Sequence, residues 1–163
     1  MKRSVSSVSL DEFDRAILRI LQVNNRTLQR TIGEQVHLSA AAVQRRIARM
    51  GASGIIAANV AIVAADAFMP SIKIVVEVHL KSDGSAMVEA TKSLFRTIPE
   101  IQHCYYVTGN GGFILIMIVQ DMPRYEKLAR ALFADNATVD TYRTLVVLDS
   151  VKTSTMVDIP ELD

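Results

Sequence analysis

The sequence predicts an α+β protein: a helical N-terminal part followed by a β-α-β-β-α-β part. Two patterns support this. Apolar residues recur at helical spacing through the first 54 residues, and strand-like and helix-like patterns alternate over residues 71–150. Charge also divides the chain. Residues 1–60 carry nine Lys/Arg against four Asp/Glu, and the remainder carries nine against thirteen. A basic first part joined to an acidic second part indicates that only the first meets a polyanion.

Three helices are expected in the first part. The first begins after Asp11, which forms a capping arrangement with Asp14, and Asn24-Asn25 ends it. The second ends near His37, whose side chain tolerates the left-handed backbone of a turn, and Ser39 caps the third. The residues expected to face inward are Phe13, Ile17, Ile20, Leu21, Leu28, Ile32, Val36, Val43, Ile47 and Met50.

The third of these helices has an outer face suited to DNA. Small residues at its start, followed by arginines, allow close approach to a groove and contacts with phosphates or guanine edges. We therefore predict a helix-turn-helix, with Arg45 and Arg49 in or beside the major groove and Arg26 and Arg30 on phosphates. The alternative is a three-helix bundle whose arginine face is only solvated. The candidate DNA-binding residues are Arg26, Arg30, Ser39, Ala41, Ala42, Gln44, Arg45, Arg46 and Arg49.

The second part predicts a ferredoxin-like domain. Strands are expected at residues 72–80, 101–108, 113–119 and 138–148, and helices at 85–98 and from Asp121 to about 133, with Pro123 in the first turn. Asn110-Gly111 lies between two strand-like runs and is a strong hairpin signal. Two helices cover one face of a four-stranded sheet. We therefore expect the second face to be covered by dimerisation.

The glycine-rich stretch TGNGGFILIMIV, residues 108–119, needs a separate reading. A phosphate-binding loop requires a helix directly after its glycines, whereas a β-branched strand follows here. The stretch is therefore read as a turn. Because Cys104 is the only cysteine, the chain has no internal disulfide, which fits a reducing cytosol. The Cys104 side chain is expected to be buried. No signal peptide, membrane span or metal-ligand spacing is found, so we expect a cytoplasmic protein without a cofactor.

The order of these features resembles the Lrp/AsnC (leucine-responsive, feast/famine) transcriptional regulators. The matching stretches are residues 10–18 (LDEFDRAIL), Leu38-Ser39, Gly54-Ile55-Ile56, Val107-Thr108-Gly109, Asp121-Met122 with Tyr125, and Val151-Lys152. The resemblance covers roughly residues 9–157. It implies a helix-turn-helix domain at 1–54, a linker strand or hinge at 55–70, an effector-binding and oligomerisation domain at 71–150 and a tail at 151–163.

For function, the resemblance implies a homodimer that assembles further, with an octamer favoured, and that binds double-stranded promoter DNA. It also implies an amino acid or related metabolite bound between dimers beside the glycine turn. Many members have two acidic residues in this turn, but this chain has Asn110 and Gly112, so a typical amino-acid effector is in doubt. The expected effector-binding residues are Tyr106, Thr108, Gly109, Asn110, Gly111, Gly112, Met122, Leu145, Val146 and Val147.

Two other functions remain open at this point. A ligand-independent architectural DNA binder is consistent with the missing acidic residues. Proteins built like these regulators also occur as siroheme decarboxylase subunits, in which histidines do the chemistry, and His79 and His103 are the candidates here. Neither histidine has an acidic partner at a telling spacing, so an enzyme is not expected.

Overall fold

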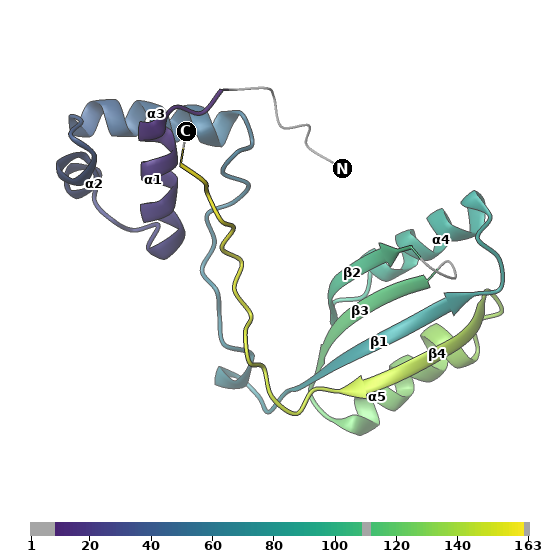
Figure 1. Cartoon of the computed structure of the whole chain (residues 1–163). Coiled ribbons are helices and arrows are strands. Elements are labelled where there is room, and N and C mark those ends of the chain that lie inside the picture. The colour runs from purple at the N-terminus through teal and green to yellow at the C-terminus, as the bar shows by residue number, and fades with distance from the viewer. Residues whose placement is uncertain (1–8, 109–111, 162–163) are drawn as a thin grey trace. The chain divides into compact units, whose positions relative to one another are not determined.

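A computed structural model describes residues 9–108 and 112–161 (Figure 1). The chain forms two compact units. The first comprises residues up to Ile62 together with the segment from Thr153, and the second comprises Val63–Lys152. Residues 151–163 are expected to form a separate tail, but the described part of that tail from Thr153 onward belongs with the helical unit.

The first unit contains α1 (Glu12–Val23), α2 (Gln29–Val36) and α3 (Ala40–Ala52). Its core is built from Ile17, Ile32, Val43 and Met50, which have no exposed surface. Two residues expected to face inward do not. Leu28 is 72% exposed because it precedes the first turn of α2 as its N-cap, where helical periodicity does not yet apply, and Phe13 is 41% exposed.

The turn between α2 and α3 depends on a left-handed residue and a close backbone approach. His37 has φ 57° and ψ 40°, as expected for the residue that reverses the chain. A Cβ on Gly33 would lie 2.4 Å from the carbonyl oxygen of Leu38, so only glycine fits there. Ser39 then caps α3, and its hydroxyl accepts a hydrogen bond of 3.2 Å from the N–H of Ala42.

The linker differs from the expectation of a strand. Residues 55–70 contain no strand, and their only regular element is a short 3₁₀ helix at Ala65–Ala67. The physical reason is that strand pairing needs a neighbour, and within the described chain no extended segment pairs with this one.

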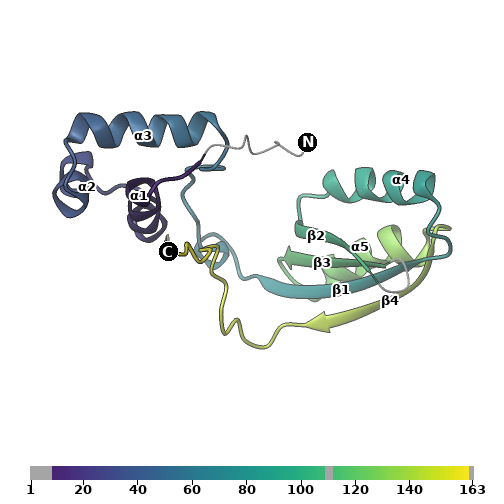
Figure 2. The same ribbon diagram turned by 45° about the horizontal axis from the view of Figure 1, so that its top comes forward.

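The second unit has the predicted β-α-β-β-α-β order. Its elements are β1 (Ile72–Leu80), α4 (Ser85–Arg96), β2 (Ile101–Val107), β3 (Gly112–Val119), α5 (Met122–Ala129) and β4 (Val139–Val146). A single π-helical turn, Arg130–Ala134, extends α5. The strands form an antiparallel sheet in the order β2-β3-β1-β4. Figure 2 shows α4 and α5 on the same side of this sheet.

The two faces of the sheet differ in what covers them. On the helix-covered face, alternate residues of β1 and β3 are buried, and the core there includes three phenylalanine rings. Phe95 of α4 lies edge-on to Phe113 and Phe133, with ring centroids 5.4 and 6.2 Å apart. The open face carries a row of isoleucines on β3, Ile114, Ile116 and Ile118, that remain partly exposed in the single chain.

Cys104 is exposed, which corrects the expectation that it is buried. It pairs with Leu115 on the helix-covered face, but β2 is an edge strand and the cover is incomplete there. Within the described residues, no helix is long and apolar enough to cross a membrane.

Candidate nucleic-acid interface and effector site

The outer face of α3 presents a small, polar surface to solvent. Ala41, Gln44 and Arg45 are exposed, while Ala42 is partly buried beside the capping Ser39. Within residues 9–108 and 112–161, the Arg45 side chain forms no ion pair. This face therefore offers an uncommitted guanidinium behind a helix start that bulky side chains do not block.

The other two arginines of α3 bind α1. Arg46 donates hydrogen bonds to Asp14 (2.8 Å) and Asp11 (2.7 Å), and Arg49 also donates to Asp14. Asp14 has no exposed surface, whereas the Arg46 and Arg49 side chains are 21% and 46% exposed. Both arginines are candidate DNA-binding residues, and each of them has a partner inside the domain. We call these four residues the α1–α3 clamp.

The clamp shifts the pKa values of its members. Partial burial of Asp11 raises the pKa of its carboxyl, but hydrogen bonds from the Asp14 backbone N–H and from Arg46 outweigh burial, so the net pKa is lowered. The same hydrogen bonds to Asp11 and Asp14 raise the pKa of Arg46. The Arg46 guanidinium also lies 5.4 Å from the centroid of the Phe13 ring. Phe13 thus contacts the clamp rather than the core.

Two further candidate arginines lie outside the clamp. Arg26 is exposed in the connection between α1 and α2. Arg30 on α2 pairs with Glu34 at 3.1 Å, with both side chains strongly exposed. An exposed pair of this kind is weak in water, so Arg30 can exchange Glu34 for a phosphate at little cost.

The candidate effector residues fall at opposite ends of the sheet. Val107 and Gly112 pair where the β2–β3 hairpin begins, and Tyr106 and Thr108 lie at that end. Met122 follows β3 at the other end, where Leu145 and Val146 close β4 and Val147 follows it. Gly109, Asn110 and Gly111 lie outside the described residues. One chain therefore does not bring the two groups together.

Tyr106 has a cationic neighbour. Its ring lies 5.0 Å from that of Phe113, and the Lys92 ammonium of α4 lies 4.9 Å from its centroid. Although Cys104 is exposed as a residue, partial burial of its thiol raises the pKa, and the nearby charges of Arg96 and Lys92 on α4 oppose this rise. Lys92 is also paired with Glu89 at 2.7 Å, whereas Arg96 forms no ion pair within the described residues. The hairpin end thus presents the positive charge of Arg96 near an exposed phenol, an arrangement that favours a carboxylate.

Gly112 is not part of an open turn, contrary to the sequence analysis. It is the first residue of β3, is buried, and pairs with His79 of β1. A Cβ at this position would lie 3.2 Å from both the Val78 carbonyl oxygen and the His79 Nδ1. These contacts are tighter than usual, so a side chain at position 112 requires Val78 and His79 to give by a few tenths of an ångström.

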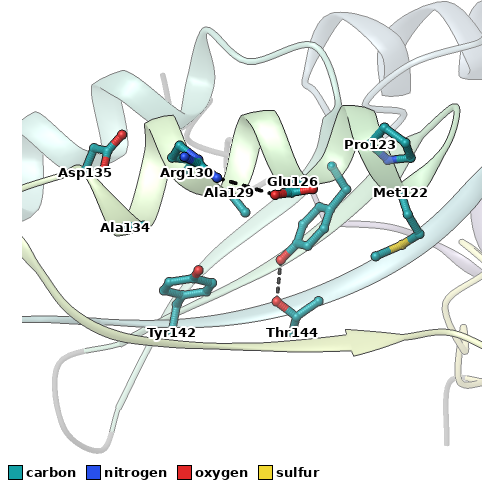
Figure 3. A pocket seen from close by; sticks show the side chains of 10 residues that line it. Met122, Pro123, Glu126, Ala129, Arg130, Ala134, Asp135, Tyr142 and Thr144 are labelled. Atoms are coloured by element: carbon teal, nitrogen blue, oxygen red, sulfur yellow. Dashed lines mark hydrogen bonds and ion pairs between the residues drawn. The ribbon is translucent and has the colours of Figure 1, made fainter.

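A cavity that the sequence analysis missed lies between α5 and β4 (Figure 3). Its volume is about 720 Å³, and Met122, Tyr125, Tyr142 and Thr144 contribute to its lining. The Tyr125 hydroxyl lies 2.5 Å from Thr144 Oγ1, and burial raises the pKa of Tyr125. Glu126 and Arg130 pair across its rim at 3.4 Å. The sequence signal for this cavity was Tyr125 in the apolar stripe of the predicted helix. The same pattern is typical of a helix that packs on a core, so it did not indicate a cavity.

The histidines do not form a catalytic pair within the described chain. His79 on β1 and His103 on β2 are both on the open sheet face, and β3 lies between their strands. His103 stacks on Tyr105 with ring centroids 6.0 Å apart. Among the described residues, no group of three or more His, Cys, Asp or Glu side chains is placed to hold a metal ion.

Two family models match the chain. Residues 10–50 match the AsnC-type helix-turn-helix domain, and residues 73–157 match the Lrp/AsnC ligand binding domain. An uncharacterized HTH-type transcriptional regulator of Sinorhizobium fredii is 37% identical over 153 residues, covering 94% of this chain and 90% of its own. The leucine-responsive regulatory protein of Escherichia coli is 30% identical over 145 residues, covering 89% and 88%.

Solved structures share the fold. AsnC of Escherichia coli superposes with a TM-score of 0.82 at 20% identity, covering 91% of this chain and 99% of its own. The regulator NMB0573 of Neisseria meningitidis, solved as a complex with L-Met, gives a TM-score of 0.84 at 23% identity, covering 92% and 97%.

Proposed function

We propose, because the chain belongs to the Lrp/AsnC family of transcriptional regulators, that α3 enters the major groove of promoter DNA with Arg45 and Gln44 reading bases. The observation that carries this assignment is that both side chains are exposed on α3 while Arg46 and Arg49 bind Asp14. Arg26 and Arg30 supply phosphate contacts from the neighbouring elements. Ala41, Ala42 and Ser39 keep the start of the helix small enough for close approach.

Arg45→Ala tests the assignment. Fragments bound by the wild-type protein are first selected from genomic DNA, including the promoter of its own gene. Loss of a base-reading arginine should weaken specific binding by about 1–3 kcal/mol, or roughly 5- to 150-fold, and relax specificity at one position. The matched control is Arg130→Ala, an exposed arginine of the second unit whose loss should leave DNA affinity unchanged. Wild-type affinity in Arg45→Ala at several salt concentrations would overturn the placement.

The second part of the proposal is that a small carboxylate-bearing effector binds between copies of the chain. It is supported by the split of the candidate residues, because Tyr106 and Thr108 can meet Met122 and Leu145–Val147 only if different chains contribute them. Lys92 lies beside Tyr106, and its pair with the exposed Glu89 is weak in water, so an effector carboxylate can replace Glu89 there. NMB0573 was solved with L-Met, so methionine and other amino acids with apolar side chains are the first compounds to test.

Calorimetry with a panel of amino acids and related metabolites tests this part. Binding to simple amino acids should be weak, because a neutral hydrogen bond contributes about 1 kcal/mol and no acid at position 112 holds an ammonium group. Lys92→Gln should reduce affinity for any ligand found, with Lys127→Gln on α5 as the control. Sub-micromolar binding of lysine would contradict the proposed recognition, because its second ammonium needs acidic partners.

Assembly is the third part. The row Ile114, Ile116 and Ile118, with Val75 and Leu145 beside it, gives the open face of the sheet an apolar strip that a second copy covers. Dimers then associate further, with an octamer favoured. Sedimentation at micromolar concentration should show a dimer or larger species, and Ile116→Glu should shift it toward monomer. A wild-type monomer would refute the assembly.

A ligand-independent architectural DNA binder is the alternative. The observation that favours it is that Gly112 is buried against β1, where an acidic side chain would make tight contacts of 3.2 Å with Val78 and His79. If no compound of the panel changes DNA affinity or thermal stability while Arg45-dependent binding persists, this alternative replaces effector control.

A further inference from the structure

One face of α1 holds the main chain of the C-terminal segment. Arg19 donates two hydrogen bonds to the Ile159 carbonyl, from Nε at 3.1 Å and from a terminal nitrogen at 2.9 Å. Arg15 donates to the Pro160 carbonyl at 3.0 Å. The yellow C-terminal segment can be followed beside α1 in Figure 1. These contacts join residues about 140 positions apart in the sequence and belong to the first unit.

The third contact reproduces the bonding of a β-strand. The Gln22 side-chain amide donates to the Val157 carbonyl at 3.0 Å and accepts from the Val157 N–H at 2.8 Å. Arg15, Arg19 and Gln22 are spaced i, i+4 and i+7, so they share one helix face. Within the described residues, every side-chain hydrogen bond of these three residues is made to a main-chain group of the C-terminal segment. This face therefore recognises an extended peptide by its backbone rather than by its side chains.

A buried donor on the same face remains unused. Arg15 Nε is shielded from solvent and has no hydrogen-bond partner among the described residues. A buried guanidinium N–H without an acceptor is unfavourable, so it indicates a site with capacity for one more main-chain or carboxylate oxygen. Ile159 is the one residue of 151–161 that is partly buried, and Pro160 beside it restricts the chain before docking.

We propose that α1 is a docking site for an extended peptide, that residues 153–161 occupy it, and that this docking links the effector domain to the DNA-binding helix. The link rests on the proposed function, because candidate effector residues Leu145–Val147 stand shortly before the segment. α1 is also the helix whose Asp14, next to Arg15, holds α3 through the clamp. A change at the end of β4 thus reaches α3 through the segment, α1 and Asp14.

Hydrogen exchange of the full-length protein tests the docking. The double variant Arg19→Ala/Gln22→Ala removes four hydrogen bonds to Ile159 and Val157, and exchange at residues 153–161 should accelerate by about five- to fifty-fold. Trypsin should also cut faster after Lys152, which is exposed and precedes a stretch without Lys or Arg. Glu12→Gln, an exposed substitution on the same helix, is the control. Unchanged exchange and cleavage in the double variant would overturn the proposal, provided its helical circular dichroism is native.

Reciprocity tests the link without an identified effector. If docking favours the DNA-binding arrangement, then adding the selected promoter fragment must slow exchange at residues 153–161 as well as at α3. The double variant should lose the first effect and keep the second. Protection of α3 without any change at 153–161 in the wild type would refute the link and leave DNA binding intact. If no fragment is bound, the proposed function fails, and the comparison of free proteins still decides the docking.

Discussion

Removing the Asp14 side chain should destabilise the helical unit while leaving the other unit folded. The carboxylate is fully buried and accepts from Arg46, from Arg49 and from the Asp11 N–H at 3.2 Å. Hydrogen bonds to charged groups contribute about 1.5–3 kcal/mol each, and breaking a buried pair costs about 3–5 kcal/mol. Both arginines keep some access to water, so Asp14→Ala should cost about 3–4 kcal/mol, near the lower end of the second range.

The arginine variants give a graded series. Arg46→Ala should cost about 2–3 kcal/mol, because this side chain is mostly buried, binds both Asp11 and Asp14 and packs on Phe13. Arg49→Ala should cost about 1 kcal/mol or less, because its side chain is nearly half exposed and water replaces the lost partner. The expected order of destabilisation is therefore Asp14, then Arg46, then Arg49.

Two optical probes separate the units during urea unfolding. All four tyrosines lie between residues 105 and 142 in the second unit, and the chain has no tryptophan, so tyrosine fluorescence reports that unit alone. Circular dichroism at 222 nm reports α1–α3 as well. The clamp variants should lower the dichroism midpoint and leave the fluorescence midpoint in place. Equal shifts in both probes, or an Arg49→Ala cost matching that of Asp14→Ala, would refute the clamp.

Three other substitutions probe single contacts. Gly33→Ala should destabilise the helical unit by about 1–3 kcal/mol, since its Cβ would stand 2.4 Å from a backbone oxygen; a neutral result by circular dichroism would mean that the turn relaxes freely. Tyr125→Phe should cost the second unit about 1 kcal/mol by losing its bond to Thr144, measured by urea unfolding against a Tyr105→Phe control. The hydrogen bond from Arg124 lowers the pKa of Glu100 below its ordinary 4.5. This pair therefore stabilises the folded state above pH 4.5, and the stabilisation should be lost as the pH falls through the lowered pKa. An equally steep acid transition in Glu100→Gln would contradict this.

Periodicity predicted the three helices of the first unit and the β-α-β-β-α-β order of the second, although the strand expected in residues 55–70 does not form. The alternation of Phe113, Leu115 and Met117 with Ile114, Ile116 and Ile118 places one set in the core and the other on the open face, and both sets are apolar. The pattern therefore predicts a strand covered on both sides, and hence a second layer. Capping residues were equally informative, because the Asp11 and Ser39 hydrogen bonds are local in sequence.

Features that depend on distant partners could not be read from the sequence. Helical spacing places Arg46 and Arg49 on a basic face, and their assignment to DNA stays a prediction, but the spacing does not reveal that both bind the buried carboxylate of Asp14 on α1. Cys104 follows an apolar strand pattern, but its exposure depends on β2 being an edge strand, which is a property of the whole sheet. Gly112 looked like a turn residue because the register that pairs it with His79 cannot be read from composition.

Effector control of DNA binding requires an effector to discriminate between arrangements of the DNA-binding unit. A single unstructured linker would transmit little of the effector's binding free energy to the DNA-binding unit. The effector domain would make the same contacts with its ligand in every arrangement of the two units, so no arrangement would be favoured. This chain passes between its units twice, once near Ile62 and again near Lys152, and the second passage is docked on α1. A second connection between the units restricts the relative arrangements that a single linker alone would allow. Under the proposed link, an effector that moves the end of β4 changes the free energy of docking of residues 153–161 on α1. By reciprocity, the factor by which such an effector changes the affinity for DNA equals the factor by which DNA changes the affinity for the effector.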